Sequence, residues 1–520
     1  MKALISVYDK TGVVDFARDL LKVGVDLVST GGTHQTLKDS GLTVEQVSDL
    51  TGSPEILGGR VKTLHPTIHG GILARRDNPE HIFELSNRQI ETIDLVAVNL
   101  YPFADTIAKP GITLDFALEN IDIGGPTMIR AAAKNFPFVT VVVDPSDYQM
   151  VIERMTQGGL TLEERRDLAQ KAFQHVAFYD TIIANYLRND SQRELFPQEL
   201  TLAYRKVQGL RYGENPHQKG ALYAEPSVPF GCLATGAQIL GQELSLCNIY
   251  DMSAALETVR EFTDHPAAVV IKHATPSGFA LGTTLSEALE KAIHADATSA
   301  FGGIIGINRS MDLETAQVVA SFRELESSNI DAIVTPGIDE EAVNILRKTR
   351  RRMVVYSVPG IDSLPSNTMN IKQVPGGLLY QEANTTAVDR ASWKVVSKKS
   401  PTAEQLKGME EAWLLIRHIR SNTILIWNQA DRVTLGIGSG QVSRVGSARL
   451  ALDQAGERSR GAILASDSFF PFQDTVELAA EYGIAAIVQQ GGSINDQLSI
   501  EAADSAGIIM VMTGERAFWH

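Results

Sequence analysis

Apolar and polar positions alternate along the first 150 residues in the way expected of strands separated by helices. Four β-rich segments are predicted as strands: residues 4–9, 25–30, 95–103 and 138–144. Helical patterns follow the first two of them, over residues 13–24 and from about Thr33 onward. Alternation of this kind predicts a parallel sheet that is covered by helices.

A helical pattern then runs from residue 146 to 188, and the polar segment 188–202 interrupts it. We interpret this segment as a linker between a first module, residues 1–195, and a second, residues 203–520. The strand-like segments of the second module are 267–278, 302–308, 332–337, 352–357, 433–441, 462–467, 485–493 and 508–514. So many strands predict two α/β subdomains. The first and fifth segments each run into a small polar loop, which suggests an internal duplication.

Composition narrows the functional classes. A chain of 520 residues is too long for one hydrophobic core. The net charge of −15 argues against a nucleic-acid groove, but not against small anionic ligands. No apolar run predicts a membrane span, and the N-terminus lacks the pattern of a signal peptide. Two cysteines without zinc-site spacing fit a reducing compartment, so we expect a cytoplasmic enzyme with no membrane or nucleic-acid partner.

Candidate chemistry in the first module lies at the ends of the predicted strands. Ser29, Thr30, Gly31, Gly32 and Thr33 follow a strand and open a helix, where backbone N–H groups can cradle a phosphate. A tight turn without a ligand explains the same segment equally well. The pattern is not GxGxxG, so dinucleotide binding is not favoured.

Further candidates in this module are the polar and ionisable residues of later strand ends and helix starts. They are Arg60, Lys62, His65, Asn99, Tyr101, Asp122, Arg130 and Lys134. Open α/β sheets place ligand chemistry at such strand ends. Core packing of Tyr101 and helix capping by Asp122 are the structural alternatives.

The clearest candidate in the second module is the pair Lys272 and His273, at the end of an apolar strand. A charged lysine is rarely buried unless it is paired, so this position favours a functional role. Histidine exchanges protons near neutral pH, although a histidine bonded within the core is the ordinary alternative. We expect the strand to deliver both residues directly into a Thr-Pro-Ser-Gly turn.

Other segments of this module combine polar, small and aromatic residues in turns. Residues 211–218, RYGENPHQ, are typical of a binding edge, and a small-residue turn carries Gln441 and Arg444. Residues 465–474 set aromatic rings beside acidic groups, which suits a flat ligand. A strand end would produce the same aromatic pattern.

Taken together, these segments resemble one family. The motifs are DKTG, STGGT, LGGRVKTLHP, NLYPF, IDIGGPTMIRAAAKN, RYGENPHQ, the Lys-His strand, SAFGG, SGQVSR and FFPFQD. From Met1 to His520 the chain is similar to the bifunctional purine biosynthesis proteins. These join phosphoribosylaminoimidazolecarboxamide formyltransferase to inosine monophosphate cyclohydrolase.

The resemblance implies a methylglyoxal-synthase-like, parallel-sheet first module that closes the purine ring. It also implies a second module of two cytidine-deaminase-like subdomains. That module would transfer formyl from 10-formyltetrahydrofolate, a co-substrate, to the 5-amino group of 5-aminoimidazole-4-carboxamide ribonucleotide. The family is homodimeric, with formyltransferase sites at the subunit interface. The deaminase zinc signature is absent, so we expect no catalytic metal and no tightly bound cofactor.

Site residues follow from these motifs and from the resemblance. We assign catalysis of formyl transfer to Lys272, His273 and Asn422, and of ring closure to Lys62, Tyr101, Asp122 and Lys134. Nucleotide-binding residues are expected to be Lys10, Ser29, Thr30, Gly31, Gly32, Thr33, Arg60, Thr63, Asn99, Gly124, Gly125, Arg211, Tyr212, Asn248, Phe469 and Arg516. Pro471, Phe472 and Asp474 are expected near the folate.

The chain departs from the family pattern at two places. Thr275-Pro276-Ser277 stands where the family has Asn-Pro-Cys, and Tyr8 stands where it has serine. Two other functions stay open from the residues alone: a zinc-free nucleoside deaminase or amidohydrolase, and a non-catalytic nucleotide sensor.

Overall fold

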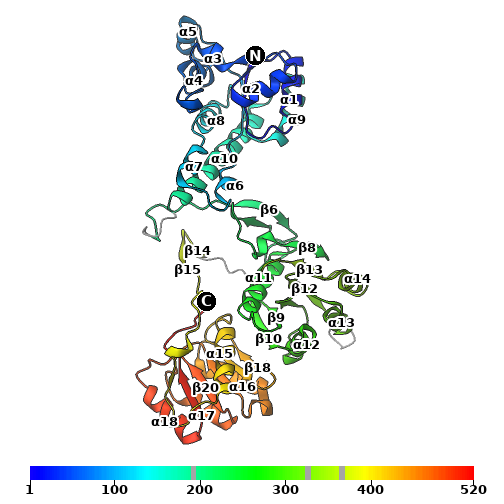
Figure 1. The fold of residues 1–520 in the computed structure, drawn as a ribbon, viewed down its shortest axis with the longest axis vertical. Helices are drawn as coiled ribbons and strands as arrows, with labels where there is room; N and C mark the ends of the chain where they lie inside the picture. Colours follow the sequence, from blue (N-terminus) through cyan, green and yellow to red (C-terminus); the bar gives the residue numbers. More distant parts are fainter. Residues whose placement is uncertain (189–194, 323–328, 362–368) are drawn as a thin grey trace. The chain divides into compact units, whose positions relative to one another are not determined.

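The computed structural model describes residues 1–188, 195–322, 329–361 and 369–520 (Figure 1). The chain forms two compact units. The first comprises Met1–Arg205 with Glu225–Ser227, and the second comprises Lys206–Ala224 with Val228–His520. Residues 189–194 of the expected linker lie outside the described residues.

A parallel sheet forms the centre of the first unit, as predicted. Among the described residues its strand order is β3-β2-β1-β4-β5. The strands are β1 Lys2–Ser6, β2 Asp26–Ser29, β3 Glu45–Gln46, β4 Leu95–Val98 and β5 Thr140–Val142. Four of them end before the predicted boundaries, because the residues that follow leave the sheet as loops.

Helices pack around this sheet. They are α1 Val13–Lys22, α2 Gly31–Asp39, α3 Val47–Thr51, α4 Pro66–Leu73, α5 Pro79–Asn87, α6 Phe103–Ile107, α7 Leu114–Glu119, α8 Gly124–Lys134, α9 Tyr148–Thr156 and α10 Leu162–Arg188. In α1, Val13, Phe16, Ala17 and Leu20 are buried, the spacing of one apolar helix face. Every residue of β4 is buried, as expected of a strand covered on both faces.

The second unit is built on one large mixed sheet. Within the described residues its order is β16-β21-β20-β19-β17-β18-β10-β9-β11-β12-β13-β8. The bounds are β8 Ala237–Leu240, β9 Ala267–Lys272, β10 Thr275–Leu281, β11 Gly303–Ile307, β12 Ile330–Thr335, β13 Val354–Ser357, β16 Lys394–Val395, β17 Ile424–Asn428, β18 Val433–Gly438, β19 Ile463–Ser466, β20 Ala486–Gln489 and β21 Ile509–Met512. Two hairpin sheets pair β6 Arg205–Leu210 with β7 Gly220–Ala224, and β14 Met369–Val374 with β15 Gly377–Glu382.

The same element order occurs twice in this unit. The first copy is α11–β9–β10–α12–β11–α13–β12–α14–β13, and the second is α15–β17–β18–α16–β19–α17–β20–α18–β21. Their helices are α11 Leu246–Arg260, α12 Leu285–Ala295, α13 Leu313–Ser321, α14 Glu340–Thr349, α15 Ala403–Ile416, α16 Arg444–Ala455, α17 Asp474–Glu481 and α18 Asp496–Ala506. The two copies join where β10 pairs with β18, at Ala280 and Val433.

Alternate residues of the sheet point into different cores. Val269 of β9 and Leu425 of β17 share one core with α11 and α15. On the opposite face, Val270 packs with α12 and Ile426 packs with α16. The unit is therefore a three-layer α/β structure, because each strand buries both of its faces.

Two sequence expectations are corrected here. Thr275–Gly278 is not a turn: it begins β10, and the tight turn is formed by His273 and Ala274. Both of these residues have positive φ values, 55° and 56°, which fit a two-residue hairpin turn. The duplication is real, but the expected match was misaligned, since β18 is the counterpart of β10 and β17 that of β9.

Candidate active sites

Two lysines flank the first turn of α2, where a phosphate cradle was expected. A Cβ added to Gly31 would lie 3.5 Å from Lys62 Nζ, and one added to Gly32 would lie 3.8 Å from Lys10 Nζ. Backbone N–H groups at a helix start and nearby ammonium groups both attract an anion. The structure therefore brings together Lys10, Lys62 and the glycine pair.

The hydroxyl groups of this segment already have protein partners. Ser29 Oγ donates to the Ile5 carbonyl at 2.7 Å, and Thr33 Oγ1 donates to the Val7 carbonyl at 2.9 Å. Thr30 Oγ1 donates to Glu55 Oε1 at 3.0 Å. These bonds fix the shape of the cradle, which leaves its backbone N–H groups and the lysines to meet a ligand.

Asn99 connects the loop after β4 to the loop after β1. Its Oδ1 accepts hydrogen bonds from the N–H groups of Tyr8 at 2.6 Å and Asp9 at 3.0 Å. Its Nδ2 donates to the Asp9 carbonyl at 3.1 Å. Asn99 is thus a positioning group for the loop that carries Lys10.

Asp122 caps α8, and the pKa of its carboxyl group is raised. Its Oδ1 accepts from Gly125 N at 2.8 Å, and its own N–H donates to the Tyr179 hydroxyl at 2.8 Å. Burial raises the pKa of Asp122, against the opposing effects of the Gly125 N–H and the Lys62 charge. A Cβ on Gly124 would lie 2.7 Å from Thr63 Oγ1, so this glycine permits a close approach of the two loops.

Two expected residues lie away from this cluster. The exposed Arg60 pairs with Glu119, and the pKa of its guanidinium is raised by that carboxylate. Lys134 is exposed at the last residue of α8, about 15 Å along the helix axis from Gly124. The structure therefore does not bring Lys134 to Asp122.

In the second unit, Lys272 and His273 lie at the β9–β10 turn. Lys272 Nζ donates to the Phe301 carbonyl at 2.9 Å. His273 is exposed. Asp251 of α11 supports the turn, because its Oδ1 accepts from Ala274 N at 2.6 Å. The pair thus lies on a hairpin turn that Asp251 supports, with the side chain of His273 exposed.

Two acidic residues beside this turn were missed by sequence reasoning. Burial raises the pKa of both Asp251 and Asp331. The charges of Arg211 and Lys272 oppose that rise at Asp331, so these three groups lie near one another. No local motif marks the two acids, because Asp251 meets the turn at Ala274, 23 residues on, and the cations that act on Asp331 are Arg211 and Lys272, from other segments of the chain.

The other expected nucleotide contacts of this unit have local roles. Arg211 lies over the Tyr212 ring, 4.7 Å from its centroid, and donates to the Tyr212 hydroxyl at 3.0 Å. Asn248 is buried in the capping box of α11 with Ser245. Its Oδ1 accepts from both the N–H and the hydroxyl of Ser245.

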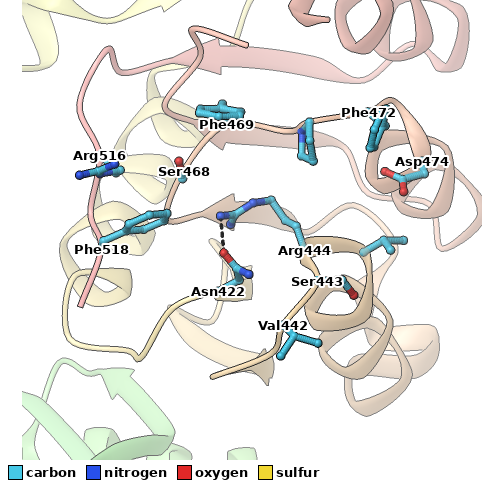
Figure 2. Close-up of a pocket in the computed structure, with 12 residues that line it drawn as sticks. Asn422, Val442, Ser443, Arg444, Ser468, Phe469, Phe472, Asp474, Arg516 and Phe518 are labelled. Carbon is cyan, nitrogen blue, oxygen red and sulfur yellow. Dashed lines mark hydrogen bonds between the residues drawn. The ribbon is translucent and has the colours of Figure 1, made fainter. Parts of the chain in front are cut away.

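A pocket of about 530 Å³ opens in the second copy of the repeat (Figure 2). Its lining residues are Asn422, Val442, Ser443, Arg444, Val445, Ser468, Phe469, Pro471, Phe472, Asp474, Arg516 and Phe518. Six of these were expected from the sequence: Asn422, Phe469, Pro471, Phe472, Asp474 and Arg516. Among the described residues that line it, Lys272 and His273 do not occur.

A buried ion pair organises the floor of this pocket. Arg444 pairs with Asp467, whose side chain is fully buried. Arg444 also donates to Asn422 Oδ1 at 2.9 Å (Figure 2). Asn422 Nδ2 donates to the Gln441 carbonyl at 2.9 Å. This chain of bonds fixes the orientation of the Asn422 amide.

Comparison with known proteins identifies the family. The model of the AICARFT/IMPCHase bienzyme matches residues 132–454, and that of the MGS-like domain matches residues 12–127. The chain belongs to the AICARFT/IMPCHase bienzyme family.

Relatives of similar length support this membership. Three proteins named bifunctional purine biosynthesis protein PurH come from Trichormus variabilis, a Thermoanaerobacter species and Listeria welshimeri. They are 50%, 48% and 48% identical to this chain, cover all of it, and are themselves covered over 99%, 99% and 100%.

A solved structure described as the crystal structure of ForH is 39% identical to this chain. It covers 37% of this chain and 100% of its own, with a TM-score of 0.34.

The family assignment confirms the expected MGS-like fold of the first unit, in agreement with its parallel sheet. In the described residues no helix is long and apolar enough to span a membrane. The same residues contain no group of three or more His, Cys, Asp or Glu side chains arranged to hold a metal ion.

Proposed function

We propose that the two units divide between them the two activities of the AICARFT/IMPCHase bienzyme family. The protein is a bifunctional enzyme of purine biosynthesis. The second unit transfers formyl from 10-formyltetrahydrofolate to 5-aminoimidazole-4-carboxamide ribonucleotide. The first unit cyclises the formylated product to inosine monophosphate. We assign formyl transfer to residues 203–520 and cyclisation to residues 1–195.

Formyl transfer needs a proton acceptor, because the 5-amino nitrogen is a weak nucleophile. In the proposed step this nitrogen bonds to the formyl carbon, the bond from that carbon to N10 of the folate breaks, and N10 takes up a proton. His273 accepts the amine proton, and Lys272 stabilises the charge of the tetrahedral intermediate or protonates N10. The exposed imidazole on a rigid hairpin turn supports this assignment.

The pocket around Asn422 supports the placement of nucleotide and folate. Phe469 and Arg516 offer a ring and a cation to the nucleotide, together with Arg211, Tyr212 and Asn248 near the β9–β10 turn. Pro471, Phe472 and Asp474 form the side of the pocket assigned to the folate. Asn422 orients His273 or the formyl oxygen, a role that suits an amide held by Arg444.

A homodimer would complete the formyltransferase site. Strand directions place the β9–β10 turn and Asn422 at the same edge of the sheet. Two strands, β10 and β18, lie between β9 and β17, a separation of about 14 Å at the usual strand spacing. We propose that His273 of one copy meets the Asn422 pocket of a second copy. We further propose that each half of the repeat is a cytidine-deaminase-like subdomain, which its repeated order supports.

Ring closure needs less activation, because both reacting groups belong to one molecule. The carboxamide nitrogen bonds to the formyl carbon, and the formyl oxygen then leaves as water. Asp122 and Tyr101 transfer the protons, and Lys62 stabilises the developing oxyanion. Lys134 is assigned the same role as Lys62 by resemblance alone. Lys10 and the Ser29–Thr33 turn hold the 5′-phosphate, with Arg60, Thr63, Asn99, Gly124 and Gly125 around it.

The proposal also covers the location of the enzyme and the molecules that it binds. We place it in the cytoplasm, with small nucleotide and folate substrates and no tightly bound cofactor. The observation that carries the proposal is the gathering of six expected residues in one pocket of a chain whose family is bienzymatic.

Conversion of 5-aminoimidazole-4-carboxamide ribonucleotide to inosine monophosphate tests this function. We expect product only when 10-formyltetrahydrofolate is present, and we expect His273→Ala to stop formylation while preformed formylated nucleotide is still cyclised. Release of ammonia without the formyl donor would instead indicate a deaminase. Nucleotide binding without any turnover would indicate a sensor.

A further inference from the structure

Two tyrosine rings meet at the carboxyl edge of the parallel sheet in the first unit. Tyr8 lies in the loop after β1, and Tyr101 lies in the loop after the neighbouring strand β4. Their ring centroids are 5.3 Å apart and their planes are inclined by 85°. This edge-to-face geometry is the favourable one for two aromatic rings.

Neither ring belongs to the hydrophobic core. Tyr8 is 52% exposed and Tyr101 is 36% exposed, whereas the strands behind them are almost fully buried. Each of the two side chains is therefore partly exposed to solvent. A half-exposed ring contributes little to folding, which makes the contact between them a candidate for a functional role.

The backbone of Tyr8 is held independently of its ring. Its N–H donates to Asn99 Oδ1 at 2.6 Å, and its carbonyl accepts from Lys10 Nζ at 3.5 Å. Removal of the ring should consequently leave the loop, and with it the position of Lys10, in place.

Tyr101 lies near Tyr179, which contacts the backbone of Asp122. Burial raises the pKa of Tyr179 to about 12, and the charges of both Asp122 and Tyr101 contribute to that rise. Tyr179 in turn bonds to Asp122 N. Proton transfer requires donor and acceptor within about 3 Å, so the direction of the Tyr101 ring matters.

We propose that Tyr8 is a positioning residue for ring closure. Its contact with Tyr101 restricts the rotation of that ring and presents the Tyr101 phenol to the nucleotide beside Asp122. Without the contact, the exposed phenol samples other rotamers, and a smaller fraction of bound substrate meets a correctly placed donor. The inference rests on the cyclohydrolase activity proposed above.

Steady-state cyclisation of preformed formylated nucleotide by the full chain tests the role of Tyr8. We expect Tyr8→Ala and Tyr8→Ser to lower kcat about fivefold, with a smaller change in KM. Tyr8→Phe keeps the ring and should stay within about twofold of wild type. Inosine monophosphate binding and formyltransferase turnover serve as controls for folding, and both should be unchanged.

A double-mutant cycle shows whether Tyr8 acts through the Tyr101 hydroxyl. In a Tyr101→Phe background, Tyr8→Ala should have no further effect on kcat, because the positioned group is gone. An undiminished effect in that background, or wild-type kcat in Tyr8→Ala, overturns the proposal. A wild-type chain that does not cyclise the nucleotide would instead remove the proposed function itself.

Discussion

Asp122 accepts the N–H of Gly125 through Oδ1, and the same bond caps a helix and holds a carboxyl group in the site. The sequence left helix capping and proton transfer as alternatives for Asp122; the structure shows the capping bond, and proton transfer is our proposal. Burial disfavours the charged form and raises the pKa of this carboxyl. Ionised Asp122 is therefore lost on acidification at a higher pH than an ordinary aspartate would require.

Substitution of Asp122 by Asn separates its two roles. Asn keeps an oxygen for the Gly125 N–H but cannot transfer a proton, so we expect cyclisation to fall at least about 100-fold. The raised pKa stabilises the wild-type fold below its unfolded-state pKa, and this contribution is lost as pH rises through the folded-state value. Asp122→Asn should thus be at least as thermally stable as wild type at neutral pH. A marked loss of melting temperature there would show that the charged carboxylate is needed for folding.

At the scale of elements, the β9–β10 hairpin turn decides where the reactive pair lies. His273 and Ala274 adopt left-handed backbone conformations that cost non-glycine residues roughly 1 kcal/mol or more each. Asp251 offsets part of this cost, because its carboxylate accepts the Ala274 N–H. The turn is thus supported by α11, the helix that precedes β9 in the chain.

Removal of the Asp251 carboxylate should loosen this turn. We expect Asp251→Ala to lower the free energy of unfolding by about 1–2 kcal/mol and formyl transfer by about tenfold. Asp251→Asn, which keeps an acceptor oxygen, should lose less of both. Urea unfolding and the formyltransferase assay measure the two effects. Equal behaviour of the Ala and Asn variants would contradict a role for the hydrogen bond.

At the scale of the whole molecule, the two copies of the repeat have diverged at equivalent positions. Asn308 follows β11, the third strand of the first copy, and its amide bonds to the backbone of Phe262, His265 and Ala267. Asp467 follows β19, the third strand of the second copy, and pairs with Arg444 at the floor of the pocket. At this position the first copy has only hydrogen bonds of a neutral amide side chain. The second copy has a charged pair, and its Arg444 positions Asn422.

Mixing two inactive variants tests whether a second copy completes the formyltransferase site. In a dimer of His273→Ala with Asn422→Ala, one site combines the intact His273 and the intact Asn422 pocket. Random exchange makes half of the dimers mixed, each with one intact site of two, so about one quarter of wild-type turnover should return. Failure to regain turnover after verified subunit exchange would place both residues in a site within one chain.

The sequence by itself determined the order of the strands and helices, the parallel sheet of the first unit and half of the residues that line the Asn422 pocket. These follow from local hydrophobic patterns and from motifs whose residues are adjacent in the chain. Tertiary structure decided the His273–Ala274 turn, the contact of Asp251 with that turn, the nearness of Asp331 to Arg211 and Lys272, and the distance of Lys134 from Asp122. Those features depend on contacts between different segments of the chain. The position of Lys134 depends on the length of α8, which places its last residue far from its first turn.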